Sequence, residues 1–404
     1  MPLDDVNLFD LARVQERGFP HDWFKRLRAE APVYRHPAPD GAGYFWVISR
    51  YADVVRLSKD PGLYSSARGT NLWEHAQEDL PAVQSMMVNM DPPQHVKYRR
   101  LVSGGFTPRM VSRLEPHIRE LARQIVDRIA GKGECDFVRE VAAELPLQVI
   151  AELMGVPCDE RQRIFDWSNR LIGFDDPEFQ SSLNDGKAAA TELWIYAQKM
   201  ATERKTAPRE DLVSSMVHGA VDGEHLSELE INNFVLLLAV AGNETTRNLI
   251  SGGMLTLMEN PGQRDRLLAD RGLLPLAVEE MLRWVTPVNH FRRTVTRDHE
   301  LHGQLLRQGD RVSLWYPSAN RDEEVFRDAD QFDVGREPND HLAFGMGEHF
   351  CLGANLARLE IQIMFEELLE RLPDLRLAGT PIRLRSNFIN GIKQMPVRYT
   401  PEHG

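Results

Sequence analysis

Residues 344–353 read Phe344-Gly345-Met346-Gly347-Glu348-His349-Phe350-Cys351-Leu352-Gly353, and an apolar helical pattern follows them. The glycines allow backbone conformations and close approaches that residues with a Cβ atom resist. Because Cys351 lies just before the expected helix, backbone N–H groups and the helix dipole favour its thiolate form. Such a thiolate suits a single soft metal centre. We do not expect zinc there, because no second ligand lies at zinc-finger spacing. A buried structural cysteine is the alternative interpretation of this stretch alone.

Outside this stretch, most of the chain has the 3.6-residue hydrophobic period of amphipathic helices. Proline and glycine pairs such as Pro61-Gly62 and Pro261-Gly262 mark turns between the elements. The chain contains neither an internal repeat nor a low-complexity tract. The pattern predicts a mainly α fold with a few short strands. The clearest expected helices are 111–130, 145–154 and 352–372, and the expected strands lie at 44–49, 311–315 and near 397–399.

One expected helix stands apart by its length. Ser227 and Glu230 form the S-x-x-E pattern of a capping box, and Asn260 precedes a Pro-Gly stop, so the helix spans roughly 50 Å. Residues 234–240 are mostly apolar, but polar side chains follow at 243–246, directly after Gly242. Buried polar groups must be hydrogen-bonded or they cost stability, and a glycine costs about 1 kcal/mol relative to alanine. Either a functional site or a water-satisfied kink explains this polar turn.

The composition narrows the possible classes of protein. The 404 residues give a length-based expectation of about two or three domains, and the net charge is −12. Such an acidic chain lacks the clustered cations of nucleic-acid binding, so we expect no nucleic-acid partner. Three cysteines cannot form a disulfide framework and fit a reducing cytoplasm. With no signal-peptide pattern and no apolar run near the about 20 residues of a membrane span, we expect a cytoplasmic protein without a membrane anchor.

The loop at 344–353 meets all six fixed positions of the pattern Phe-Gly-x-Gly-x-His-x-Cys-x-Gly, and it resembles the heme-binding loop of the cytochrome P450 monooxygenases. The resemblance implies one mainly α domain over residues 1–404, a helical prism with a small β-sheet region. The single domain implied by the resemblance replaces the two or three domains expected from the chain length. The resemblance also implies heme b as cofactor, with the Cys351 thiolate as the iron ligand, a ligation that favours O–O cleavage. Phe344, Gly345 and Gly353 would shape the loop against the heme.

Further motifs follow in the order of that family. Glu280-Met281-Leu282-Arg283 resembles its Glu-x-x-Arg motif, and Arg336 would join both residues in a structural network behind the heme loop. The resemblance also assigns four residues to the two heme propionates. Cationic or hydrogen-bonding partners suit those carboxylates, although each residue alone could be a solvated surface group. The four are His95, Arg99, Arg293 and His349.

The polar turn of the long helix resembles the oxygen-activation motif of the family. Ala241 and Gly242 would let oxygen and substrate approach the helix, and Ala241 would contact both heme and substrate. Glu244 and Thr245 correspond to an acid–alcohol pair. The implied roles are proton delivery by Glu244 and hydrogen bonding by Thr245 to iron-bound peroxide, because cleavage of the O–O bond needs positioned acid/base groups.

Positions that match the substrate-pocket walls of the family are mostly apolar, which favours a hydrophobic ligand. Two stretches, 241–248 and 384–393, look like those of bacterial members that oxidise steroid side chains and branched lipids. We therefore expect a sterol, terpenoid or fatty-acid-like substrate. Further lining is expected from residues 71–90 and 171–193. The expected wall residues are Leu237, Val240, Ala241, Val288, Asn289, Phe291, Phe388 and Ile389.

The sequence thus predicts a bacterial monooxygenase that inserts one oxygen atom of O₂ into a C–H bond with two electrons from outside. Because the chain has no redox module of its own, we expect a ferredoxin and a ferredoxin reductase as donors, acting on a monomer. Lys97, Arg99, Arg100, Arg109 and Arg113 form a basic stretch that either steers an acidic ferredoxin or is a solvated helix face. A peroxide-driven peroxygenase and a non-catalytic heme sensor are the alternatives, and the complete Glu244-Thr245 pair disfavours both.

Overall fold

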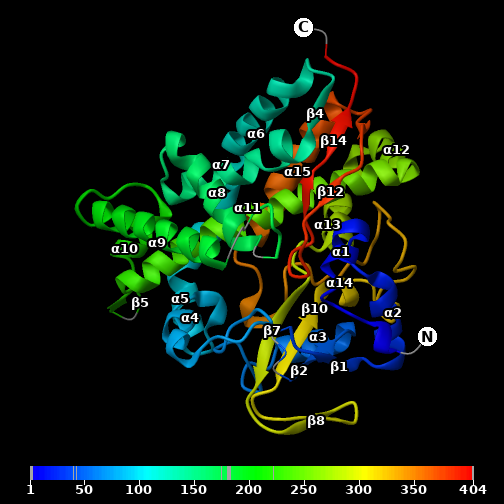
Figure 1. The fold of residues 1–404 in the computed structure, drawn as a ribbon. Coiled ribbons are helices and arrows are strands. Elements are labelled where there is room, and N and C mark those ends of the chain that lie inside the picture. The colour runs from blue at the N-terminus through cyan, green and yellow to red at the C-terminus, as the bar shows by residue number, and fades with distance from the viewer. Residues whose placement is uncertain are drawn as a thin grey trace.

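The computed structural model describes residues 3–39, 41, 43–173, 175–179, 183–221 and 223–402 (Figure 1). Residues 174 and 180–182, which belong to the expected lining segment 171–193, lie outside the described residues. The same holds for residues 1–2 and 403–404 at the ends of the expected domain. Helices make up most of the described structure, as the hydrophobic period predicted.

The helices begin and end at recognisable local signals. Asp10, Thr107, Asp211 and Ser227 each accept a hydrogen bond from a first-turn N–H, and Gly155 ends its helix in the left-handed conformation. The helices are α1 Leu11–Arg17, α2 His21–Glu30, α3 Tyr51–Ser58, α4 Leu80–Gln84, α5 Gln94–Ser103, α6 Pro108–Ala130, α7 Glu144–Met154, α8 Arg161–Ile172, α9 Leu183–Thr206, α10 Leu212–His218, α11 Glu228–Glu259, α12 Pro261–Ala269, α13 Leu274–Val285, α14 Tyr316–Ala319 and α15 Ala354–Arg371.

Five strands form the main sheet in the order β1-β2-β10-β7-β3, with β10 parallel to β2 and the other pairs antiparallel. A three-stranded sheet, β11-β14-β4, and three hairpin pairs complete the β structure. The strands are β1 Val33–Pro37, β2 Tyr44–Ile48, β3 Tyr64–Ser65, β4 Glu134–Asp136, β5 Ala220–Val221, β6 Glu224–His225, β7 His290–Val295, β8 His299–Leu301, β9 Gln304–Leu306, β10 Arg311–Trp315, β11 Arg376–Leu377, β12 Ile382–Arg383, β13 Ile392–Gln394 and β14 Pro396–Arg398.

The expected elements are confirmed with small shifts at their ends. The strand predicted at 311–315 is β10, and the helices predicted at 111–130 and 145–154 are α6 and α7. The last predicted helix starts at Ala354 rather than 352, because Leu352 and Gly353 complete the turn after Cys351 and Gly353 occupies the N-cap. Cys351 therefore lies three residues before the first turn of α15, close to its N-terminus as expected.

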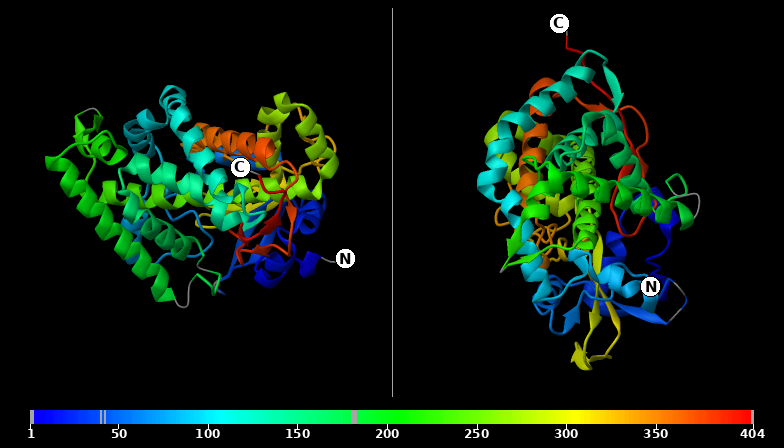
Figure 2. Two further views of the ribbon diagram at one scale, coloured as in Figure 1. Left: turned by 90° about the horizontal axis from the view of Figure 1, so that it is seen from above. Right: turned by 90° about the vertical axis from the view of Figure 1, so that its left-hand side faces the viewer.

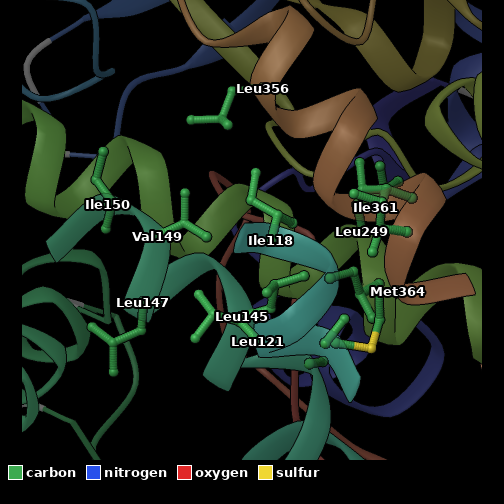
Figure 3. Close-up of a cluster of buried hydrophobic side chains, with 14 of the residues drawn as sticks. Ile118, Leu121, Leu145, Leu147, Val149, Ile150, Leu249, Leu356, Ile361 and Met364 are labelled. Atoms are coloured by element: carbon green, nitrogen blue, oxygen red, sulfur yellow. The ribbon is translucent and has the colours of Figure 1, made fainter. Parts of the chain in front are cut away.

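Figure 2 shows the five-stranded sheet and the N-terminal helices grouped at one end of the molecule, with the long helices at the other. The 32-residue α11 runs through the helical part and starts with the predicted capping box of Ser227 and Glu230. Apolar side chains of α6, α7 and α15 pack against those of α11 (Figure 3). Among them, Ile150, Leu249, Leu356 and Ile361 also face a large cavity, so the core itself forms a wall of that cavity.

The predicted charge network of Glu280, Arg283 and Arg336 is present and buried. Arg283 donates to the Glu280 carboxylate at 2.7 and 2.8 Å, and Arg336 Nε donates to it at 3.0 and 3.1 Å. The two guanidinium groups also donate to backbone carbonyls of residues 320–331. The network thus holds α13 against the segment that leads to the Cys351 loop. Within the described ranges, no helix combines the length and apolar character needed to cross a membrane.

Candidate active site

A cavity lies between α5, α11, β7 and the Cys351 loop, and the space not filled by atoms in the cavity and its open mouth is about 1540 Å³. The cavity brings together residues that lie up to 274 positions apart, from Met87 to Ile361 on α15. Every residue predicted to contact the cofactor lines it. These residues are His95, Arg99, Ala241, Arg293, Phe344, Gly345, His349, Cys351 and Gly353.

The loop before α15 fixes Cys351 on the cavity wall. The Cys351 N–H donates to the carbonyl oxygen of Phe344 at 2.9 Å, which closes the loop on itself. Gly347 has φ +76°, and a Cβ atom there would collide with the carbonyl oxygen of Ser58 on α3, so only glycine fits this position. Burial raises the pKa of the Cys351 thiol, whereas the Gly353 amide and the positive charge of Arg99 act in the opposite direction.

Four hydrogen-bond donors gather at one side of the same cavity. The rings of His95 and His349 lie 4.2 Å apart between centroids, and Arg99 and Arg293 face the cavity beside them. Within the described part of the chain, neither arginine forms an ion pair, and the buried His95 Nδ1 has no hydrogen-bond partner. Burial and the nearby positive charge of Arg293 lower the pKa of His349 to about 2.

This donor set fits a heme. A buried cation without a carboxylate partner, here Arg293, is costly, and three more donors lie beside it, so the cluster calls for anionic groups inside the cavity. The two propionates of heme b supply such groups, and Cys351 lies on the wall of the same cavity as a soft axial ligand. The residues present are therefore suited to hold heme b, with Cys351 on the iron and His95, Arg99, Arg293 and His349 on the propionates.

The wall formed by α11 separates the two members of the predicted acid–alcohol pair. Thr245 lines the cavity and donates to the carbonyl oxygen of Ala241 at 2.9 Å. Glu244 does not line it: its side chain is buried in an ion pair with Arg247, which also donates to Asn169 of α8 at 2.8 Å. Burial raises the pKa of Glu244, and Arg247 counteracts that shift. Successive helical residues point about 100° apart, so the two side chains cannot share one face.

The predicted substrate residues divide into two groups. Leu237, Ala241, Val288 and Phe291 line the cavity. Val240, Phe388 and Ile389 belong instead to a small apolar cluster beside it, and Asn289 is turned into the protein, where its side chain donates to the carbonyl oxygen of Asn387 at 3.0 Å. Their predicted contact with substrate stays a prediction.

Sequence reasoning missed several residues of the wall. Phe234 and Leu238 share the helical face of Leu237 and Ala241, so the i, i+3 and i+4 spacing of α11 could have identified them. Phe106 and Ile150 carry no such signal, since only tertiary packing brings α7 and the short helical turn after α5 to this cavity. From the expected segment 71–90, Met87 and Val88 line the cavity, whereas no described residue of 171–193 does.

Comparisons with known proteins identify the family. The cytochrome P450 family model matches residues 6–373. A steroid C26-monooxygenase of Rhodococcus jostii is 43% identical over 401 residues, covering 97% of this chain and 84% of that protein. A methyl-branched lipid omega-hydroxylase of Mycobacterium tuberculosis is 43% identical over 387 residues, covering 93% of this chain and 90% of that protein.

The fold agrees with solved structures of the same family. A Mycobacterium marinum cytochrome P450 in complex with pseudoionone superimposes with a TM-score of 0.92, at 39% identity and with 99% of both chains covered. A Bacillus megaterium cytochrome P450 in complex with testosterone gives a TM-score of 0.86 at 31% identity, covering 99% of this chain and 100% of that chain. With its thiolate loop, its donor cluster and these relatives, the chain belongs to the cytochrome P450 family and is a heme b monooxygenase.

Proposed function

We propose that this monooxygenase hydroxylates a sterol, terpenoid or fatty-acid-like lipid. The observation that carries the proposal is the wall of the cavity above the Cys351 loop, which is predominantly apolar and includes Phe234, Leu237, Leu238 and Phe291. Apolar walls with few polar groups bind hydrophobic ligands and exclude water. The similar proteins act on steroids and methyl-branched lipids by name, which supports the same substrate class here.

The residue roles follow from the geometry. Heme b held through a thiolate supplies O₂ binding and reductive O–O cleavage. The overall reaction takes a C–H bond, O₂, two electrons and two protons, and gives an alcohol and water. We assign to the Thr245 hydroxyl, at the cavity surface, the task of holding a proton donor close to the reacting oxygen. The apolar walls orient the substrate C–H bond and exclude bulk water from the site.

We assign the supply of protons to Glu244. Its carboxyl is buried on the protein side of α11, directly before Thr245, and its Oε1 atom has no hydrogen-bond partner in the described residues. Since burial raises its pKa, this carboxyl can hold a proton closer to neutral pH than an exposed glutamate does. It must turn toward the cavity or act through an intervening water, because its side chain does not line the cavity.

We propose a ferredoxin with its reductase as the electron donor, docking outside the Cys351 loop. A surface groove there is lined by α5 and the loop, including Arg99, Arg100 and Glu348. In the described structure, Arg100, Arg109 and Arg113 are exposed without ion-pair partners, whereas Lys97 pairs with Glu224 at 3.0 Å. The apolar Phe350 of the Cys351 loop is also exposed. Exposed basic side chains suit an acidic partner protein.

An isotope experiment tests the reaction class. The purified holoprotein with a ferredoxin, its reductase and a panel of steroids, terpenes and fatty acids should form a hydroxylated product that carries ¹⁸O from ¹⁸O₂. Rapid turnover with label only from ¹⁸O-labelled hydrogen peroxide would indicate a peroxygenase. Absence of oxygen uptake with every donor would indicate a heme-binding protein without catalysis. The complete Glu244-Thr245 pair favours the first result.

A further inference from the structure

The segment that leads into the Cys351 loop is held to α13 by the side chain of His341. This side chain is only 3% exposed, and each of its two ring nitrogens has a partner. Nε2 lies 3.1 Å from the Glu279 carboxylate on α13, and the N–H of Ala343 donates to Nδ1 at 3.2 Å. His341 therefore forms a bridge between α13 and the backbone of the loop. The proposed function gives this bridge no role.

The two partners fix the tautomer of the His341 ring. Burial raises the pKa of Glu279, but hydrogen bonds from Arg358 and His341 outweigh burial and lower this pKa to about 2, so Glu279 is a carboxylate at neutral pH. Because a carboxylate only accepts, Nε2 carries the proton. Nδ1 accepts from a backbone N–H and therefore carries a lone pair. The ring cannot turn over without losing both bonds.

The same carboxylate holds a second side chain against the loop. Arg358 of α15 donates to Glu279 at 2.7 and 2.8 Å, and its guanidinium carbon lies 4.6 Å from the centroid of the Phe344 ring. The centroid of the His341 ring lies 6.1 Å from that of Phe344. Both partners of Glu279 thus border Phe344, whose carbonyl oxygen accepts the N–H of Cys351 at 2.9 Å. A shift of Phe344 therefore reaches the backbone of Cys351.

We infer that His341 is a positioning residue for the axial thiolate: it holds residues 343–344 in place, so that the sulfur of Cys351 keeps one position on the cavity wall. The N–H of Leu342 donates to Asn320 at 2.6 Å, so the segment has one anchor at the end of α14 and a second, through His341, on α13. Groups behind a metal ligand orient it and strengthen its bond to the metal. This role is independent of the substrate.

The ferrous carbon-monoxide complex of the holoprotein reports the ligation. Its red-shifted Soret band marks thiolate ligation and decays as the iron–sulfur bond is lost. We expect His341→Ala to speed this decay by about tenfold, since a bond to a charged group and a bond to a backbone N–H are both removed. His341→Asn can still accept from Ala343 but is too short to reach Glu279, whereas His341→Gln reaches Glu279 and leaves the Ala343 N–H without its acceptor. Because the bridge needs both ends, both variants should also decay faster than the unmodified protein.

His36→Ala is the matched control. His36 on β1 is also buried, its Nε2 accepts from the Leu8 N–H at 3.1 Å, and its Nδ1 lies 2.7 Å from the Pro37 carbonyl oxygen, but it does not line the heme cavity. We expect its loss to lower the free energy of unfolding without changing the decay of the band. A decay in His341→Ala no faster than in His36→Ala overturns the inference. If His341→Ala does not fold, the Asn and Gln variants decide, and decay at the unmodified rate in either one overturns it as well.

Discussion

Replacing Glu280 by glutamine removes a fully buried carboxylate that is shared by two buried guanidinium groups, those of Arg283 and Arg336. The side chain of Glu280 accepts from Arg283 and Arg336 and also from the N–H of Asp333 at 3.0 Å and the amide of Asn339 at 3.2 Å. Both Glu280 and Arg283 are 0% exposed, so water cannot take the place of the missing charge. The Glu280→Gln variant keeps the shape of the side chain and loses its charge and one acceptor.

The expected cost follows from this burial. Removing one partner of a buried ion pair costs about 3–5 kcal/mol, because the remaining charge stays unpaired. Arg283 retains hydrogen bonds to the carbonyl oxygens of Asn320 and Ala329 at 2.8 and 2.9 Å. We therefore expect Glu280→Gln to lower the free energy of unfolding by about 3 kcal/mol, the lower end of that range. This is a large share of the total, because the free energy of unfolding of a protein is only about 5–15 kcal/mol.

Urea unfolding of the unmodified holoprotein and of the Glu280→Gln holoprotein, followed by circular dichroism, gives the free energy of unfolding of each. The difference between the two values is the cost of the substitution. Glu115→Gln is the control, since the Glu115–Arg119 pair is exposed and an exposed pair contributes below about 0.5 kcal/mol. A loss in Glu280→Gln no larger than that in Glu115→Gln would refute the structural role assigned to the network.

Four further predictions concern the site and its surroundings. Thr245→Ala should lower the product formed per electron and raise peroxide release, because the hydroxyl that holds the proton donor is lost. Thr245→Ser keeps the hydroxyl and should keep the product yield per electron. An unchanged product yield per electron in Thr245→Ala would contradict the proton role. Arg293→Leu removes a charged side chain that we expect to donate to a propionate, so it should speed heme transfer to a heme-scavenging protein by about tenfold or more. An unchanged transfer rate would count against the proposed donor cluster. The pKa of Glu279 is lowered to about 2 by hydrogen bonds and charge from Arg358 and His341, against the opposing effect of burial, so this carboxylate stabilises the fold above its unfolded pKa near 4.5. The stability advantage of the unmodified protein over Glu279→Gln should therefore be full at neutral pH and disappear as the pH falls from about 4.5 to about 2, as acid titration of the unfolding free energy will show. Arg100→Glu should raise the KM for ferredoxin without changing kcat, and the effect should shrink at high salt, whereas a salt-independent loss would argue against electrostatic docking.

The parts of the site that depend on local sequence were predictable. The glycines around Cys351, the capping box of α11 and the Glu280–Arg283 spacing each encode a geometry within a few residues, and the structure has all three. The resemblance to the cytochrome P450 family then predicted contacts that local spacing cannot predict. It grouped His95, Arg293 and His349, which lie on three separate elements and meet only through the fold.

The remainder depended on how elements rotate and pack. Val240 lies only three residues from Leu237, yet it faces the apolar cluster rather than the cavity. Glu244 is turned away from Thr245 by the 100° step of the helix and pairs with Arg247. The i, i+3 spacing of Glu244 and Arg247 could have predicted this pair, but the family resemblance assigned Glu244 to proton delivery instead.

The account depends most on the bond between Cys351 and the heme iron. The ferrous carbon-monoxide complex of the purified protein should show the red-shifted Soret band of thiolate ligation. The Cys351→Ala variant should lack that band, whereas a Cys135→Ala variant, altered at a buried cysteine of the β4 strand, should keep it. A Cys351→Ala protein that retains the red-shifted band would contradict the assignment of the iron ligand.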